Sequence, residues 1–258
     1  MLSIKHLQKT FYPGTPEENR VFKDFNLETQ DHGCIAILGP NGCGKSTLFN
    51  LVTGGLQADA GKIELNGLDL TPISEVDRAK YIGRVMQDPS KGVSPNLTIL
   101  ENLYLSRLKG QKFGFSSLVK KDIQDELVDK LASAKLGLEN KLNTQVKYLS
   151  GGQRQTVSLI MATYNRPDLL LLDEHTAALD PKTSYLVLEK TRDLIDREKI
   201  LTLMITHNLR TAIDFSDRII MMLAGKIVLD VPGKSLSEEE LTRIYHEKID
   251  KQRISLAS

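Results

Sequence analysis

The stretch that decides the fold is Gly39-Pro40-Asn41-Gly42-Cys43-Gly44-Lys45-Ser46-Thr47. It follows the apolar run Cys34–Leu38 and precedes the helical run Leu48–Val52, so it joins a strand to a helix. Glycines let the backbone curl until successive N–H groups and the helix N-terminus face a phosphate group. The pattern G-x-x-x-x-G-K-[ST] at such a junction favours a phosphate-binding loop over the alternative, a glycine-rich turn with a solvated lysine.

Roles within this loop follow from side-chain chemistry. We expect Lys45 to reach the β- and γ-phosphates of a nucleotide, and Ser46 to give its hydroxyl to Mg²⁺. Cys43 lies near a helix N-terminus, where a thiol can become more acidic, and we favour a filler role for it over redox control. The remaining residues of the predicted phosphate-binding set are Gly39, Asn41, Gly42, Gly44 and Thr47.

Two acids follow a second apolar run, Leu169–Leu172, which is typical of a central strand covered on both faces. Strand C-terminal ends are where open α/β sheets bind ligands. We therefore expect Asp173 to hold Mg²⁺ through its water shell and Glu174 to orient or deprotonate the attacking water, rather than both opening an exposed turn. His207 ends the next apolar run and is predicted to contact the γ-phosphate.

The rest of the chain alternates between strand and helix patterns. Asn66-Gly67 after the strand Lys62–Leu65 is a hairpin signal, so part of the sheet is predicted to be antiparallel. Capping boxes start helices at Thr98 and Ser237. Further strands are predicted over 3–11, 21–28, 201–205, 218–223 and 226–231. A helix is predicted over Arg154–Ala162. Two more helices are indicated by apolar residues at helical spacing: Val119, Ile123, Leu127 and Leu131 in one, and Leu241, Ile244, Tyr245 and Ile249 in the other.

Composition narrows the class of protein. The 258 residues carry 34 Lys plus Arg against 33 Asp plus Glu, a net charge of +1, so we expect no nucleic-acid partner. The longest apolar runs are far shorter than a membrane span. The N-terminal stretch Met1–Lys5 lacks the basic start, apolar stretch and cleavage site of a secretory signal, so a cytoplasmic protein is expected. Cys34 and Cys43 lack metal-site spacing and are predicted to be reduced thiols.

Leu149-Ser150-Gly151-Gly152-Gln153 precedes the predicted helix at 154–162. A serine cap followed by glycine amides is a second anion-binding device, although the pentapeptide alone would indicate only a helix cap. With this motif added, the sequence resembles the ATP-binding cassette (ABC) family over about Leu2–Pro232. The resemblance implies that residues 149–153 are the signature motif, which closes on ATP held by the phosphate loop of a partner subunit.

The resemblance assigns further roles. Gln87 would sense Mg²⁺ and the membrane partner, Asp180 would be the D-loop aspartate, and Phe11 would stack on adenine, with Tyr12 as the open alternative. The implied fold is α/β: a P-loop NTPase core with a mixed sheet, an antiparallel β subdomain and an inserted helical subdomain. The implied domains are one ATPase domain over 1–233, with its core at 1–87 and 166–233 and helices at 88–165, and a C-terminal helix over 234–258.

Two positions depart from the family pattern. His175 stands where proline is usual and Ala177 where serine is usual. We interpret His175 as structural rather than as a ligand, since it lies just past a strand end. The two departures also bear on the D-loop, so communication between the two ATP sites is expected to differ from the family pattern. The stretch Asn143–Tyr148 lacks the Gly-Glu-rich element of exporters and therefore resembles importers.

The function implied is that of a separate ATPase subunit that dimerises on ATP and drives a membrane permease, peripherally on the inner face of the membrane. A substrate-binding protein is an expected further partner, and residues 173–180 and 204–209 resemble importers of amino acids. A permease helix is expected to dock between Gln87 and the helix starting at Thr98, against Leu100 and Leu103. The alternatives are a cassette ATPase of translation or chromosome maintenance, and a nucleotide kinase, which has no reason to carry a signature motif.

Overall fold

The computed structural model describes residues 1–109, 121–133 and 138–257. Packing divides the chain into two compact units. Unit 1 comprises Met1–Arg78 and Lys199–Ser258, and unit 2 comprises Ala79–Glu198. The predicted subdomain division at residues 88 and 165 stays a prediction.

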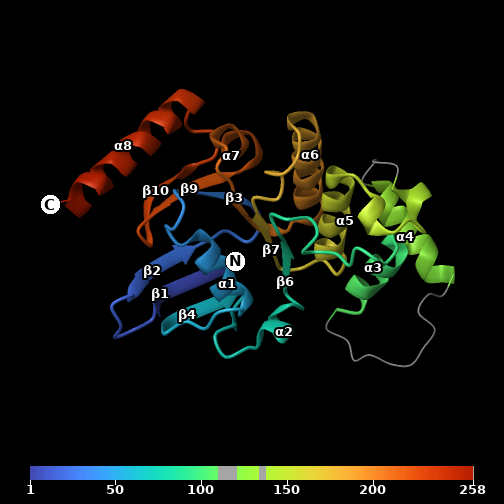
Figure 1. The fold of residues 1–258 in the computed structure, drawn as a ribbon, viewed down its shortest axis with the longest axis horizontal. Helices are drawn as coiled ribbons and strands as arrows, with labels where there is room; N and C mark the ends of the chain where they lie inside the picture. Colours follow the sequence, from blue (N-terminus) through green and yellow to red (C-terminus); the bar gives the residue numbers. More distant parts are fainter. Residues whose placement is uncertain (110–120, 134–137, 258) are drawn as a thin grey trace. The chain divides into compact units, whose positions relative to one another are not determined.

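Unit 1 contains an antiparallel sheet in the order β2-β1-β4-β5 (Figure 1). Its hairpin between β4 and β5 is closed by Asn66 and Gly67, whose φ angles are 50° and 81°. Both residue types tolerate this left-handed conformation, which a two-residue hairpin turn requires. The hairpin prediction is confirmed. The strands are β1 (Leu2–Phe11), β2 (Asn19–Glu28), β4 (Ala60–Leu65) and β5 (Leu68–Asp69).

A second group of strands in unit 1 is built around β3 (Gly33–Leu38). β3 pairs in parallel with both β8 (Leu201–Ile205) and β9 (Arg218–Leu223), and β10 (Lys226–Pro232) pairs antiparallel with β9. β8 is buried along its whole length, as its mostly apolar sequence predicts, and its one polar residue, Thr202, is buried with the rest. Because β3 and β8 are parallel, the residues that follow them leave the sheet at the same edge.

The helices of unit 1 follow these strands. They are α1 (Lys45–Thr53), α2 (Glu75–Arg78), α7 (Leu209–Phe215) and α8 (Glu238–Ala257). The predicted capping box of α8 is confirmed, since Glu240 N donates to Ser237 Oγ and Ser237 N donates to Glu240 Oε2. Within the predicted stripe, Leu241 is fully buried, whereas Ile244, Tyr245 and Ile249 are half-buried.

Unit 2 combines a parallel strand pair with helices. β6 (Ile82–Val85) pairs with β7 (Leu169–Asp173). Periodicity does not predict β6, because Gly83 and Arg84 interrupt its apolar pattern. A Cβ at Gly83 would collide with the carbonyl oxygen of Ala162, so glycine lets the last turn of a helix approach this strand.

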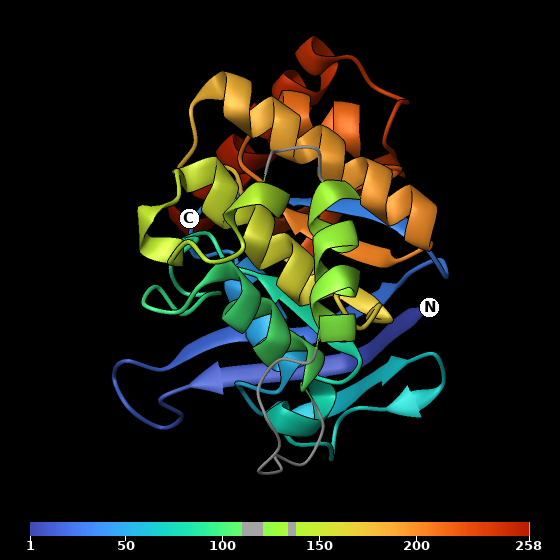
Figure 2. The ribbon, with the colours of Figure 1, turned by 90° about the vertical axis from the view of Figure 1, so that its right-hand side faces the viewer.

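The helices of unit 2 are α3 (Ile99–Arg107), α4 (Lys121–Ser133), α5 (Gly151–Thr163) and α6 (Pro181–Glu198), with 3₁₀ turns at Glu139–Lys141 and Val146–Tyr148. α3, α4 and α5 lie side by side (Figure 2). Thr98 and Glu101 form the predicted capping box. Leu127 and Leu131 are fully buried, as predicted, whereas Val119 and the side chain of Ile123 lie outside the described residues.

The predicted docking residues need a correction. Leu103 is fully buried and Leu100 is 9% exposed, and both belong to the apolar core that α3 shares with α5. These side chains pack inward because α3 has apolar residues on the face toward α5. A charged substitution there would disrupt the core, so neither residue offers a surface to a permease.

Arg78 holds the end of the phosphate-loop helix in unit 1. It is 4% exposed, and its Nη1 donates to the carbonyls of Leu51 (2.7 Å) and Val52 (3.0 Å) in the last turn of α1. Nε donates to Ile73 O at 2.9 Å, and Nη2 donates to Thr71 O at 3.2 Å. Burial lowers the pKa of this guanidinium, and the carbonyl oxygens replace water as its hydrogen-bond partners.

We expect Arg78→Met to lower the free energy of unfolding by roughly 2–4 kcal/mol, because it leaves buried carbonyls of α1 without a donor. Urea unfolding followed by circular dichroism measures this change. Arg78→Lys should recover only part of it, since one ammonium cannot reach carbonyls on several sides. Arg20→Met, which removes an exposed arginine paired with Glu18, is the control and should shift the midpoint little. Equal midpoints for Arg78→Met and wild type would refute this role.

Candidate nucleotide-binding and catalytic site

The phosphate loop of unit 1 joins β3 to α1, as predicted. Gly44 is the N-cap of α1 with φ 110°, and Gly39 has φ 147°. A Cβ at Gly39 would collide with the carbonyl of Met222, and one at Gly44 would lie 2.9 Å from Phe22 Cζ. Glycine is therefore required at both positions, by backbone conformation and by space.

Lys45 lies inside the curl of this loop. Its Nζ donates to the carbonyls of Gly39 (2.6 Å) and Pro40 (3.0 Å), and the residue is only 6% exposed. The first turn of α1 contains no acidic residue, and Ser46 on that turn is exposed. A positive ammonium beside the free N–H groups of a helix N-terminus makes this loop suited to an anion.

Cys43 does not become an acidic thiol. It is 4% exposed and its Sγ lies 3.9 Å from Lys45 Nζ. Burial raises the pKa of the Cys43 thiol, and this effect outweighs the opposing charge of Lys45. The filler interpretation is therefore favoured. Cys34 is buried as well, and neither thiol is in a disulfide.

The two acids lie in unit 2, at the end of β7. Asp173 is the last residue of the strand, and Glu174 follows it with φ 47°, a left-handed conformation that costs a non-glycine residue free energy. Arg84 Nη2 donates to Asp173 Oδ2 at 3.1 Å, and Gln87 Nε2 donates to Glu174 Oε2 at 3.1 Å. Each acid is thus held by a side chain from β6 or from the segment directly after it.

Of these four side chains, only Arg84 is missing from the sequence-based assignment. A single arginine within an otherwise apolar strand is the signal that could have indicated it, because a buried arginine needs an acid or carbonyl partner. Its partner could not be named without knowing that β6 and β7 are neighbours.

His175 is buried behind Glu174. It is 2% exposed, and its Nε2 lies 3.5 Å from Oγ1 of Thr191, which itself donates to Val187 O. Burial lowers the pKa of His175 to about 4, so the ring is neutral at physiological pH. The imidazole therefore packs against α6, which agrees with the structural interpretation of this residue.

The predicted signature motif, residues 149–153, lies at the N-terminus of α5. Ser150 is the N-cap, with Gln153 N donating to its Oγ at 3.3 Å and Ser150 N donating to Gln153 Oε1 at 3.2 Å. A Cβ at Gly152 would collide with the methyl group of Thr183 on α6, whereas Gly151 is exposed. Thr183 N also donates to Asp180 Oδ1 at 3.1 Å. Thr183 therefore contacts both the predicted signature motif, at Gly152, and the predicted D-loop aspartate, Asp180.

His207 and the predicted adenine contacts lie in unit 1. His207 lies two residues after the end of β8 and is exposed, beside Asn208, which caps α7. Phe11 is half-buried with Lys9 Nζ 5.7 Å from its ring centroid, whereas Tyr12 is 64% exposed. Either ring remains a candidate for stacking on a base.

The side chains predicted to bind Mg²⁺ supply oxygen ligands. Ser46 has an exposed hydroxyl, and Asp173 has a carboxylate with Oδ1 left beside the oxygen that Arg84 binds. Hard oxygen donors of this kind fit Mg²⁺, which keeps several waters and takes phosphate oxygens as further ligands. In the part of the chain that the structure describes, no group of three or more His, Cys, Asp or Glu residues forms an all-protein metal site.

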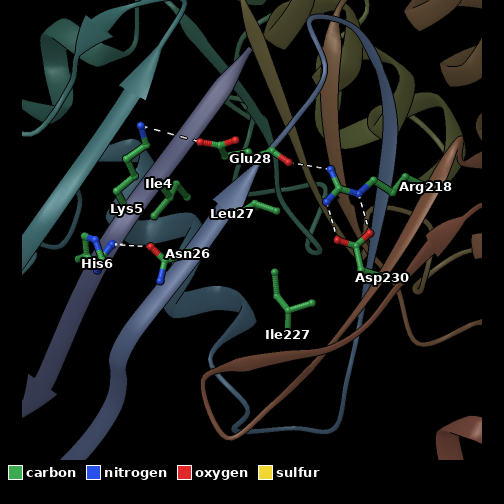
Figure 3. A pocket seen from close by; sticks show the side chains of 9 residues that line it. All are labelled: Ile4, Lys5, His6, Asn26, Leu27, Glu28, Arg218, Ile227 and Asp230. Carbon is green, nitrogen blue, oxygen red and sulfur yellow. Dashed lines mark hydrogen bonds and ion pairs between the residues drawn. The ribbon is translucent and has the colours of Figure 1, made fainter.

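A hollow of about 370 Å³ in unit 1 has a lining that includes no residue of the phosphate loop, and Figure 3 shows the residues that line it. Its charged groups already pair with one another: Arg218 binds Asp230 at 2.6 Å and the carbonyl of Glu28 at 2.7 Å, and Lys5 lies 3.8 Å from the carboxylate of Glu28. The hollow is therefore a junction between β2 and β10 rather than a ligand site. Its lining is Ile4, Lys5, His6, Asn26, Leu27, Glu28, Arg218, Ile227 and Asp230.

Comparisons with known proteins agree with this geometry. Residues 22–177 match the family model for the ABC transporter. The chain is 42% identical over 242 residues to the tyrosine transport ATP-binding protein of Clostridioides difficile (strain R20291), covering 94% of this chain and 95% of that protein. It is 34% identical to the phosphonates import ATP-binding protein PhnC of Alcaligenes faecalis, covering 95% and 88%.

Solved structures show the same fold. A dimeric ATP-binding cassette in a post-hydrolysis state, bound to ADP and Pi, has a TM-score of 0.77 and 26% identity, covering 92% of this chain and 100% of that one. The predicted fold class is thus confirmed: the fold and site define a phosphate-loop ATPase of the ATP-binding cassette type. The chain belongs to the ABC transporter family, whose ATP hydrolysis is coupled to transport. Among its described helices, none is both long and apolar enough to cross a bilayer.

The buried imidazole predicts a pH-dependent stability. Because folding lowers the pKa of His175 from 6.5 to about 4, the unfolded chain binds a proton more readily between these values. The His175 contribution to the free energy of unfolding is complete above pH 6.5 and falls by about 3 kcal/mol as pH decreases to 4. Urea unfolding without nucleotide or metal, from pH 7 to pH 4, measures it.

The matched comparison replaces one histidine at a time. His175→Phe should flatten this pH dependence, since phenylalanine has no proton to bind, whereas His32→Phe should keep it because His32 is exposed. If His175→Phe retains the wild-type slope, another group titrates in this range and the assignment is wrong.

Proposed function

We propose that this protein is the ATP-hydrolysing subunit of an ABC importer. It dimerises on binding ATP and drives a separate membrane permease, to which a substrate-binding protein delivers the transported compound. It acts in the cytoplasm, attached peripherally to the membrane through that permease. The supporting observation is that one chain carries two helices that begin at glycine-rich motifs, α1 at Lys45 and α5 after Ser150, each of a type suited to an anion. In such a dimer the helix N-terminus at Lys45 binds ATP, and the helix N-terminus at Ser150 of the other subunit closes on the same ATP.

In this proposal the loop around Lys45 binds the phosphates through backbone N–H groups and the ammonium. Ser46 and Asp173 would hold Mg²⁺, which when bound neutralises phosphate charge. Glu174 orients or deprotonates the attacking water, and Gln87 and His207 contact the metal shell and the γ-phosphate. The strained backbone of Glu174 and its hydrogen bond from Gln87 aim this carboxylate before substrate arrives.

For the transported compound we propose an amino acid, and tyrosine first. Support comes from the relative named for tyrosine transport, which is 42% identical, against 34% for the relative named for phosphonate import. The difference counts because the two alignments cover similar shares of the chain. The compound itself would be selected by the permease and the binding protein, since the ATPase subunit contacts ATP.

Replacing the proposed base tests the catalytic assignment. Glu174→Gln keeps the shape of the side chain but removes its basicity, so ATP hydrolysis should slow by at least about 100-fold while binding persists. Losing one negative charge near the γ-phosphate should also favour an ATP-bound dimer, measured as mass by light scattering with Mg²⁺ and ATP. Glu189→Gln, an exposed acid on α6, is the matched control and should hydrolyse ATP normally.

Lys45→Ala should behave differently from Glu174→Gln. It removes the ammonium from the phosphate loop, so nucleotide affinity should fall and no dimer should form. Near-normal hydrolysis by Glu174→Gln would show that another group positions the water.

Uptake measurements test the transport assignment. Cells that lack this protein should lose import of labelled tyrosine, and the wild-type gene should restore it whereas Lys45→Ala should not. Unlabelled phosphonate should not compete. Loss of phosphonate import with intact tyrosine uptake would instead favour the other class of relatives, and no effect on either compound would contradict both.

A further inference from the structure

Arg84 lies on β6 beside the acid that the proposed function assigns to Mg²⁺. The parallel register places Arg84 opposite Leu171, two residues before the end of β7. From there its Nη2 reaches Asp173 Oδ2 at 3.1 Å, with the two side chains only 19% and 16% exposed. A guanidinium is thus held against this carboxylate in a setting with little water.

This ion pair has an electrostatic consequence for a metal. A carboxylate removed from water is costly unless a positive charge compensates it, and Arg84 supplies that charge. A cation that approaches Asp173 meets the repulsion of the guanidinium and must share the carboxylate with it. At an effective dielectric constant near 20, charges separated by several ångströms still interact appreciably.

We propose that Arg84 is a positioning residue that holds Asp173 in the metal-free protein and competes with Mg²⁺ for its carboxylate. Arg84 thereby sets the concentration of Mg²⁺ at which the nucleotide site fills. The inference rests on the proposed function, because only that function places Mg²⁺ at Asp173.

A purely structural ion pair would behave differently. If Arg84 only tied β6 to β7, its removal would lower stability by the same amount with and without metal, and metal affinity would not change. A competing ion pair instead makes removal of Arg84 tighten metal binding. Metal affinity therefore separates the two roles.

The test uses Mn²⁺ as a probe of the metal site, with bound and free Mn²⁺ distinguished by electron paramagnetic resonance in ADP-saturated full-length protein. Arg84→Met, which removes the charge but keeps a long side chain, should lower the apparent Kd for Mn²⁺ at least about threefold. Its loss of thermal stability in EDTA should shrink when Mn²⁺ and ADP are added. Arg84→Lys keeps the charge and should stay within about twofold of wild type.

The controls separate failure of this inference from failure of the proposed function. Arg197→Met, which removes an exposed arginine near the end of α6, should leave the Mn²⁺ Kd unchanged. Arg84→Gln is the second neutral variant, to be used if Arg84→Met does not fold. An unchanged Kd in the neutral Arg84 variants, with weaker binding by Asp173→Asn, overturns the inference alone. An unchanged Kd in Asp173→Asn overturns the metal assignment of the proposed function and this inference with it.

Discussion

The Lys45 ammonium inside the phosphate loop is the interaction on which the rest of unit 1 depends. Its bonds to the carbonyls of Gly39 and Pro40 require a tightly curled backbone, and that curl requires glycine where β3 meets α1. The helix must then be anchored, and Arg78 does so by binding the carbonyls of its last turn. Because the last turn of α1 is fixed, the Lys45 ammonium and the N-terminus of the helix have little freedom, which is the preorganisation that suits a site for phosphate.

Unit 2 meets a different constraint, because it must hold negative charge. Two adjacent carboxylates at the end of β7 repel each other, and side chains from the β6 side compensate them: a guanidinium for Asp173 and an amide for Glu174. Behind them the neutral ring of His175 fills the space against α6 without adding charge. The N-termini of α5 and α6 meet through Gly152 and Thr183, so these two helix ends cannot move independently without repacking.

Local features of the chain were predictable because their causes are local. The Asn66-Gly67 hairpin, the capping boxes of α3 and α8 and the continuous apolar strands each follow from residues close in sequence. By contrast, strand β6 was not predicted from the sequence, because its apolar pattern is interrupted at Gly83, where α5 packs closely against the strand. Helix α6 was not predicted either, although Asp180 followed by Pro181 is a recognisable helix start. Leu100 was wrongly assigned to a surface, because the helix that covers this face of α3, α5, lies far away in the sequence.

The sequence by itself determined the family, the fold class and the identity of most proposed site residues, since motifs such as Gly39–Thr47 and Leu149–Gln153 encode chemistry within a few consecutive positions. Only the tertiary structure decided which side chains accompany them. Arg84 meets Asp173 across 89 positions, and Gln87 meets Glu174 across 87. The burial that keeps the Cys43 thiol protonated and the His175 ring neutral is likewise a property of packing. Charge compensation and desolvation depend on neighbours in space, which spacing along a chain does not specify.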